Sequence, residues 1–198
     1  MTGPSTRERM IGTAMRLFRR EGYTATSWRR LVDEAGTPWG SAYHHFPGGK
    51  EELGVAAVEF GTEYVLTTLH RAFERHESVA EAVAWWYHKA GQSLAADGYR
   101  DGCPIATLTL ETANASPRLT AACAKAFQRW HTEVTEQLRQ RGYAAGDAED
   151  LSLAIMNNLQ GALLLSRIRR DTAPLSAAAR HVAILLAAAP TGLPPRAV

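Results

Sequence analysis

A short segment near the start of the chain concentrates side chains that can bind a nucleic acid. Residues 39–45 read WGSAYHH. Serine, tyrosine and histidine can each donate a hydrogen bond to a phosphate or to a base edge, and glycine lets the backbone approach a ligand closely. The alternative is that the tryptophan, the tyrosine and the histidines are half-buried packing residues of a small helical subdomain.

The charge of the chain is unevenly distributed. Residues 1–50 contain 8 Lys and Arg against 4 Asp and Glu, a net charge of +4, whereas residues 51–198 contain 14 against 16, a net charge of −2. A basic amino-terminal part on a nearly neutral remainder favours an anionic partner for that part alone. Together with the segment at 39–45, this charge favours DNA binding over simple packing.

Apolar residues recur at a spacing of 3.6 between Gly and Pro, which predicts an all-α fold. The first helix is expected from Thr6 to Arg20, ending at Gly22, and a second from Trp28 to Ala35 with Ser27 as its N-cap. A third is expected to reach about His45, with Thr37 as its N-cap and Pro38 as its first residue. Further helices are expected from Lys50 to Arg75, with Leu53, Ala57, Phe60 and Tyr64 buried, and then at 78–96, 104–113, 116–141, 147–171 and 176–189.

The second and third helices are short and joined by a turn that contains Gly36, as in a helix-turn-helix motif. In such a motif the second helix of the pair enters the DNA major groove. Trp39 and Tyr43 are four residues apart and share one face, whereas Ala42 and Phe46 are suited to pack inward. The packing and DNA-binding sides of this helix are therefore separable.

The stretch from Thr24 to Leu53 resembles the helix-turn-helix signature of the TetR family of bacterial transcriptional regulators. Its matching features are Thr26 and Ser27, the Ala35-Gly36 turn, the segment GSAYHHF at 40–46, and Lys50. The turn FPGGK, with GCPIATLTLETA at 102–113 and GALLLSRIRRD at 161–171, is similar to the LmrA/YxaF-like branch. Ala42 stands where the family usually has Leu, and Trp39 where Lys or a small polar residue is common.

The resemblance implies a three-helix DNA-binding domain at residues 1–49, joined by the long fourth helix to a regulatory and dimerisation domain at 50–198. It implies contacts of Thr26, Ser27 and Trp28 with the DNA backbone and of Lys50 with a phosphate. The recognition surface that it implies comprises Thr37, Trp39, Gly40, Ser41, Tyr43 and His44. Arg29 and Arg30 are additional candidates for phosphate contacts.

The last two predicted helices contain more small and aliphatic residues than one exposed helix needs, as in LSLAIMNNLQGALLLSR and AAARHVAILLAAA. This composition favours a homodimer seam, and the resemblance implies a four-helix bundle made of these two helices from each subunit. Two recognition helices about 34–36 Å apart could then bind the halves of a palindromic operator.

Aromatic residues in the middle of the chain, with a few polar groups, fit a pocket for a small apolar or aromatic effector. Packing in the core is the alternative for each of them, so the pocket depends mainly on the resemblance. Trp86, Trp130 and Asn158 are the preferred lining residues, and Glu111 is expected nearby. The resulting hypothesis is a repressor that such an effector releases from its operator.

Other function classes receive less support. A redox-responsive regulator would use Cys103 or Cys123, but neither lies in an evident electropositive surface segment. The sequence has none of the H-E-x-x-H, G-x-S-x-G or P-loop motifs of common enzymes, so no catalytic residue, metal or cofactor is expected. It also lacks a run of about 20 apolar residues and a signal-like amino terminus, which predicts a cytoplasmic protein without a membrane partner.

Overall fold

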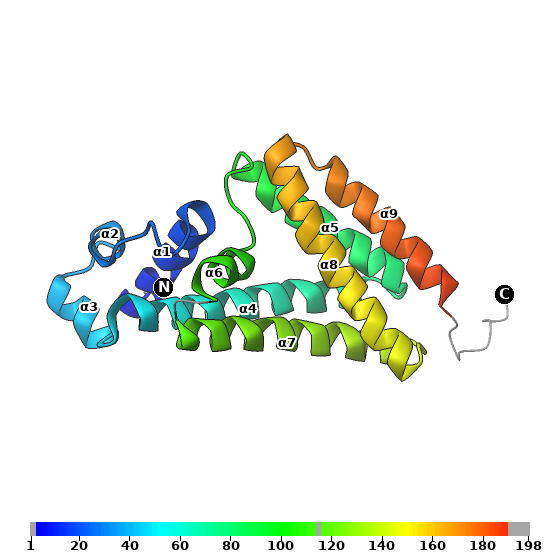
Figure 1. Ribbon diagram of the computed structural model, residues 1–198, viewed down its shortest axis with the longest axis horizontal. Coiled ribbons are helices and arrows are strands. Elements are labelled where there is room, and N and C mark those ends of the chain that lie inside the picture. The colour runs from blue at the N-terminus through cyan, green and yellow to red at the C-terminus, as the bar shows by residue number, and fades with distance from the viewer. Residues whose placement is uncertain (1–2, 114–115, 190–198) are drawn as a thin grey trace. The chain divides into compact units, whose positions relative to one another are not determined.

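The computed structural model describes residues 3–113 and 116–189, and the elements within these ranges are α-helices (Figure 1). This confirms the predicted all-α fold. In chain order the helices are α1 (Thr6–Glu21), α2 (Trp28–Glu34), α3 (Trp39–His45), α4 (Gly49–Arg75), α5 (Val79–Ala96), α6 (Pro104–Thr112), α7 (Pro117–Gln140), α8 (Ala145–Arg169) and α9 (Ala173–Ala188).

Most helix ends follow the predicted caps. Ser27 and Ser78 accept the amide hydrogens of Arg30 and Glu81 and so begin α2 and α5. The expected cap of α3 is wrong: Pro38 occupies the N-cap position, and no side chain caps the helix. The Thr37 hydroxyl instead donates to the Ala35 carbonyl at 3.4 Å, because the side chain of Thr37 is buried and faces the preceding turn.

The chain forms two compact units. The first comprises Met1–Tyr64 and Asp101–Phe127, and the second comprises Val65–Arg100 and Gln128–Val198. Helices α4 and α7 each begin in the first unit and end in the second. No helix in the described part of the chain is long and apolar enough to span a membrane.

The first unit is built around α1, which contacts α2, α3 and α6. Leu17 and Phe18 of α1 are fully buried, as are Leu31 of α2 and Ala42 of α3. Phe46, which follows α3, is also buried. The predicted inward role of Ala42 and Phe46 is confirmed, and the opposite side of α3 is left free of core contacts.

The predicted buried face of α4 is only half right. Leu53 and Ala57 are buried, but Phe60 and Tyr64 are 52% and 60% exposed. The helix packs instead through an adjacent face that contains two glycines, where a Cβ on Gly54 would lie 2.9 Å from Leu119 and a Cβ on Gly61 would lie 2.3 Å from Met15. Large apolar residues suggested the wrong face because the close approach depends on residues with no side chain.

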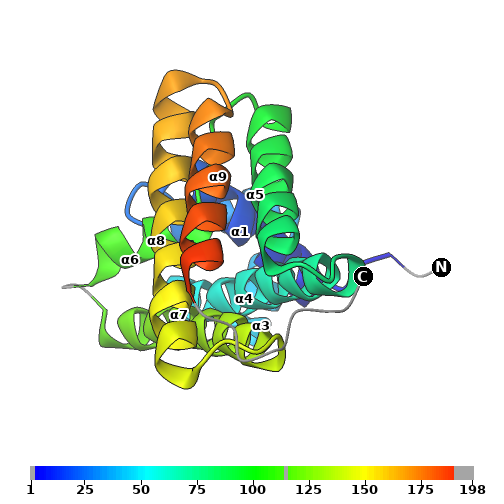
Figure 2. The same ribbon diagram turned by 90° about the vertical axis from the view of Figure 1, so that its right-hand side faces the viewer.

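In the second unit α5, α8 and α9 lie side by side, as both views show (Figures 1 and 2). Leu159 of α8 and Val182 of α9 join Trp86 and Tyr87 of α5 in one buried cluster. The Tyr87 hydroxyl donates to the carbonyl of Ile155 and links α5 to α8. Gly91 of α5 allows α9 to approach, because a Cβ there would lie 3.2 Å from Thr172.

Two fully buried serines on α8 differ in hydrogen bonding, so replacing each with alanine is expected to change the free energy of unfolding differently. The Ser152 hydroxyl donates to the His131 carbonyl at 3.1 Å, whereas the Ser166 hydroxyl has no hydrogen-bond partner among the described residues. We expect Ser152→Ala to lower the free energy of unfolding by about 1 kcal/mol and Ser166→Ala to leave it unchanged or raise it by up to about 1 kcal/mol. The gain in helix propensity is the same at both sites.

Urea unfolding followed by circular dichroism measures both serine variants under the same conditions. Equal destabilisation by the two variants would contradict the assigned hydrogen bonds.

Candidate nucleic-acid interface

Local hydrogen bonds set the turn between α2 and α3. Gly36 has φ +58°, which a residue with a side chain adopts at a cost. Its amide donates to the Asp33 carbonyl at 3.1 Å, and the Thr37 amide donates to the Val32 carbonyl at 3.2 Å. These contacts end α2 and direct the chain into α3.

Three aromatic rings meet on the side of α3 that faces away from the core. The ring centroids of Trp28 and Tyr43 are 5.5 Å apart, and those of Trp39 and Tyr43 are 6.3 Å apart. Trp39 is 45% exposed and Tyr43 is 49% exposed, whereas Trp28 is half-buried. We call Trp28, Trp39 and Tyr43 the aromatic cluster; it links the start of α2 to the exposed face of α3.

Polar residues of the predicted interface surround the aromatic cluster. Ser27, Gly40 and His44 are exposed, and Ser41 is half-buried. A Cβ added to Gly40 would meet nothing within 4 Å, so the backbone there borders open space. A phosphate or a base edge could therefore approach α3 at Gly40.

Thr26 and Thr37 occupy different positions from those that the sequence suggested. Thr26 is fully buried, and its hydroxyl donates to the Gly22 carbonyl at 2.8 Å. Thr37 is also buried. In this structure both hydroxyls hold the turns on either side of α2, and neither is presented to solvent.

Lys50 lies in the first turn of α4 and is half-buried. Its ammonium group is 4.0 Å from the centroid of the Tyr23 ring. Burial lowers the pKa of Lys50, and the carboxylate of Glu111 opposes that shift. The ammonium group is therefore held at the start of α4 by an aromatic face and a nearby negative charge.

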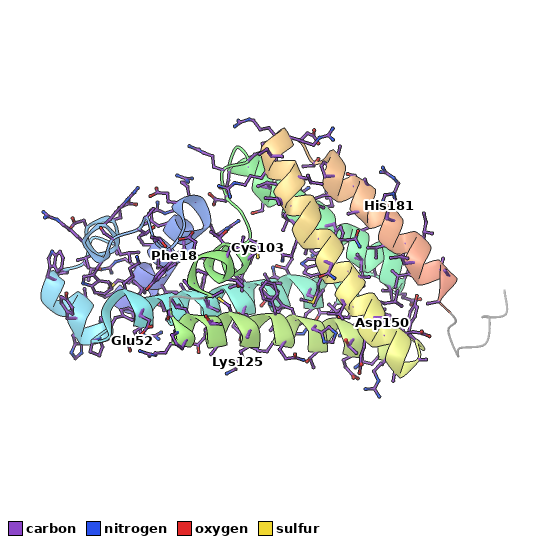
Figure 3. The ribbon with its side chains drawn as sticks, in the orientation of Figure 1. Phe18, Glu52, Cys103, Lys125, Asp150 and His181 are labelled. Carbon is purple, nitrogen blue, oxygen red and sulfur yellow. The ribbon has the colours of Figure 1, made fainter. Side chains whose placement is uncertain are left out.

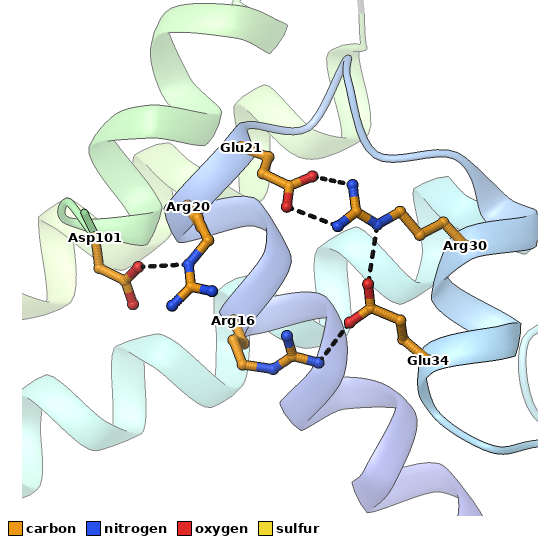
Figure 4. A network of polar contacts seen from close by, with 6 residues as sticks. All are labelled: Arg16, Arg20, Glu21, Arg30, Glu34 and Asp101. Carbon is orange, nitrogen blue, oxygen red and sulfur yellow. Dashed lines mark hydrogen bonds and ion pairs between the residues drawn. The ribbon is translucent and has the colours of Figure 1, made fainter. Parts of the chain in front are cut away.

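Ion pairs fix α2 against α1 (Figure 4). Glu34 accepts from Arg16 at 2.8 Å and from Arg30 at 2.9 Å, and Arg30 also pairs with Glu21. Arg30 is therefore engaged within the protein. Arg29 is 82% exposed, and among the described residues it forms one ion pair, a long 3.7 Å contact with Asp33. Of these two candidates Arg29 is therefore the one left open to a phosphate.

Residues on either side of α6 and within it make polar contacts with α1, with the turn that follows α1 and with α4, all in the first unit. The carboxylate of Asp101 pairs with Arg20 at 3.5 Å, a contact drawn as a dashed line in Figure 4. Glu111 accepts from the Thr24 amide at 2.7 Å. Ser116 donates to Glu51 at 2.6 Å. The Glu111 carboxylate is thus bound to the turn between α1 and α2, and its expected place near an effector pocket stays a prediction.

Comparison with known proteins identifies a family for this chain. Residues 11–57 match the bacterial regulatory proteins of the tetR family, and residues 79–181 match the C-terminal domain of LmrA/YxaF-like transcriptional regulators. The chain is 32% identical to the uncharacterized HTH-type transcriptional regulator YxaF of Bacillus subtilis, over 91% of this chain and 94% of the relative. It is 31% identical to the HTH-type transcriptional regulator LmrA of the same organism, over 88% and 93%.

The chain belongs to the TetR family. It is a DNA-binding transcriptional regulator with an LmrA/YxaF-like C-terminal domain, and the family is not enzymatic. Solved structures share the fold: a TetR regulator from Legionella pneumophila superposes with a TM-score of 0.82 at 22% identity, covering 93% of this chain and 98% of that chain. The resemblance drawn from the sequence is therefore confirmed.

In this TetR-family protein the three predicted effector-binding residues all lie in the second unit. Trp86 and Trp130 are 4% and 2% exposed, so both side chains are part of the packed interior. Asn158 is half-buried, and its amide donates to the Ala154 carbonyl of its own helix at 2.8 Å. An effector-binding role for these three residues stays a prediction.

The two cysteines differ in environment. Cys103, labelled in Figure 3, is half-buried at the start of α6, and Cys123 is buried in α7. Burial raises the pKa of the Cys123 thiol, which disfavours the reactive thiolate. Within the described ranges no group of three His, Cys, Asp or Glu side chains is arranged to hold a metal ion.

Proposed function

We propose that this TetR-family regulator is a dimeric repressor that binds a palindromic operator through α3 and is released by a small apolar or aromatic effector. The observation that carries the proposal is the aromatic cluster. Large aromatic side chains are costly to expose, and here Trp39 and Tyr43 are half exposed on the helix that enters the major groove in helix-turn-helix proteins.

The proposed contacts divide into two kinds. Trp39 and Tyr43 contact base edges, with Trp28 supporting Tyr43 from α2. The backbone contacts come from Ser27, Gly40, Ser41, His44 and Lys50. Thr26 and Thr37 take part by holding the turns that flank α2.

A second copy of the chain is the proposed partner of α8 and α9. Leu153, Leu164 and Ile168 are exposed on α8, and Ile184 and Leu185 are exposed on α9. Positions 153, 157, 161, 164 and 168 share one side of a helix, and a Cβ on Gly161 would meet nothing within 4 Å. This face is aliphatic except for the exposed Asn157 and has a glycine near its centre, which suits the close packing of helices between two subunits.

The proposed effector site is in the second unit and includes Trp86, Trp130 and Asn158. Helix α4 begins next to the helix-turn-helix and ends in that unit, so it can transmit a change from one to the other. A coupling free energy of about 1–3 kcal/mol would change operator affinity about 5- to 150-fold. Residues 1–49 then form the DNA-binding domain and residues 50–198 the regulatory domain, in a protein that works in the cytoplasm.

Release by a ligand is preferred over redox regulation through Cys123 because burial disfavours its thiolate, and the half-buried Cys103 is the remaining redox candidate. We expect the variant with both cysteines replaced by serine to bind DNA as the wild type does, both with and without an added oxidant.

Selection of DNA from random pools by the full-length protein tests the proposed function. We expect a palindromic sequence whose half-sites are centred about one helical turn apart. Titrating small apolar and aromatic compounds against the selected operator then tests release. Enrichment of no sequence would contradict operator recognition, and an asymmetric sequence would contradict binding as a dimer.

A further inference from the structure

The arginines of α1 and α2 fall into two groups. Five are within ion-pair distance of a carboxylate: Arg16, Arg19, Arg20, Arg29 and Arg30. Arg7 and Arg9, in the first turn of α1, have no carboxylate partner in the part of the chain that the structure describes. Their positive charges are therefore uncompensated by an ion pair.

Arg7 and Arg9 are nevertheless held in place against the helix-turn-helix. The guanidinium carbon of Arg7 is 5.5 Å from the centroid of the Phe46 ring, which directly follows α3. Arg9 donates to the Ala35 carbonyl, in the turn that precedes α3, at 3.5 Å, and to the Pro4 carbonyl at 3.4 Å. Both side chains are exposed, so contacts with neutral groups position them without removing their charge.

Within the described residues Glu8, the acidic residue between Arg7 and Arg9, caps the start of α1 and pairs with neither arginine. Glu8 accepts the amide hydrogen of Ser5 at 2.7 Å, and its own amide donates to the Ser5 hydroxyl at 3.3 Å. This capping box satisfies amides at the start of α1. The Glu8 carboxylate is thus oriented toward the helix end, and Arg7 and Arg9 remain available to an external anion.

We propose that Arg7 and Arg9 bind phosphates of the DNA strand that borders the major groove entered by α3. The proposal rests on the proposed function. The major groove is about 12 Å wide, so groups fixed at the turn before the recognition helix and at the residue after it lie near the phosphates that border the groove. The planar guanidinium group suits a phosphate because it can donate two parallel hydrogen bonds. These contacts are made to the backbone and carry no base preference.

The test is the salt dependence of operator binding by the full-length Arg7→Gln variant. A dimer loses two phosphate contacts, so the slope of log K against log salt concentration is expected to become shallower by about 2. Affinity is expected to fall about three- to tenfold or more at low salt, equally for the operator and for unrelated DNA. Arg9→Gln is expected to act in the same direction, and Arg7→Lys to retain most of the slope.

Arg139→Gln is the matched control, since Arg139 is exposed on α7 in the second unit and the substitution removes the same charge. It is expected to leave the slope nearly unchanged. An unchanged slope for both Arg7→Gln and Arg9→Gln, or a changed base preference, would overturn this proposal alone. A wild-type protein that binds no DNA would contradict the proposed function instead.

Discussion

Replacing Ile168 with Glu is expected to convert the protein into a folded monomer that binds its operator at least about 100-fold more weakly. Ile168 is 79% exposed on α8, so it contributes little to packing within the subunit. In the proposed dimer it lies in an apolar seam, where a buried carboxylate without a partner is strongly unfavourable. Linking two half-site contacts in one dimer strengthens binding by about 10²–10⁴, and the monomer loses that gain.

Leu110→Glu is the control for the effect of placing a carboxylate on an exposed aliphatic position. Leu110 is 86% exposed on α6, outside α8 and α9. Sedimentation velocity measures the oligomeric state, and titration with labelled operator measures affinity. A dimeric Ile168→Glu variant, or loss of the dimer in Leu110→Glu alone, would contradict the assignment of the seam to α8 and α9.

Replacing Gly22 with Ala is expected to lower the free energy of unfolding by about 3 kcal/mol or more. Gly22 ends α1 with φ +89° and ψ 168°, a region of backbone conformation that is nearly restricted to glycine and costs other residues about 1–3 kcal/mol. A Cβ there would lie 1.9 Å from Oε1 of Glu111. Displacing Glu111 would also break its hydrogen bond to the Thr24 amide, and hydrogen bonds to charged groups contribute about 1.5–3 kcal/mol.

Gly36→Ala separates the two causes. Gly36 also has a positive φ of +58°, but a Cβ there would meet nothing within 4 Å. Its expected cost is about 1–2 kcal/mol, from backbone conformation alone. In a Glu111→Ala background, Gly22→Ala should cost less than in the wild type, because the clash has been removed. Equal costs for Gly22→Ala in both backgrounds would show that Glu111 does not occupy this position.

The sequence predicted the elements of this fold well because their ends depend on local chemistry. Gly22 ends α1 and Ser27 caps α2, and each acts on neighbours a few residues away. The inward role of Ala42 followed from its spacing to Phe46 on the same short segment. Local signals of this kind sufficed to recognise the helix-turn-helix and the family.

Contacts between distant parts of the chain were not predictable in the same way. Glu111 reaches the Thr24 amide across 87 residues of sequence, and Arg7 lies over Phe46 from a different helix. No residue pattern near Glu111 distinguishes a carboxylate that binds a turn from one that faces a pocket. The exposure of Phe60 was missed because α4 packs through glycines, which carry no apolar signal in a sequence.

In the proposed complex the exposed face of α3 contacts the operator bases, and the decisive variant is Trp39→Ala. Affinity should be measured for the wild type and the variant against the selected operator and against each single base-pair substitution in a half-site. We expect the variant to lose discrimination at one position, repeated in both half-sites, with a change of about 1–3 kcal/mol there, the typical cost of a mismatched base pair. An apolar contact of the indole with a thymine methyl group would have this effect.

Phe46→Leu is the matched control in the same segment, since Phe46 is 1% exposed and belongs to the core. It is expected to reduce stability without altering base preference. The contradicting result is that Trp39→Ala, like Phe46→Leu, lowers stability or lowers affinity equally for every sequence. Trp39 would then only cover α3, and recognition of bases by Trp39 would be excluded.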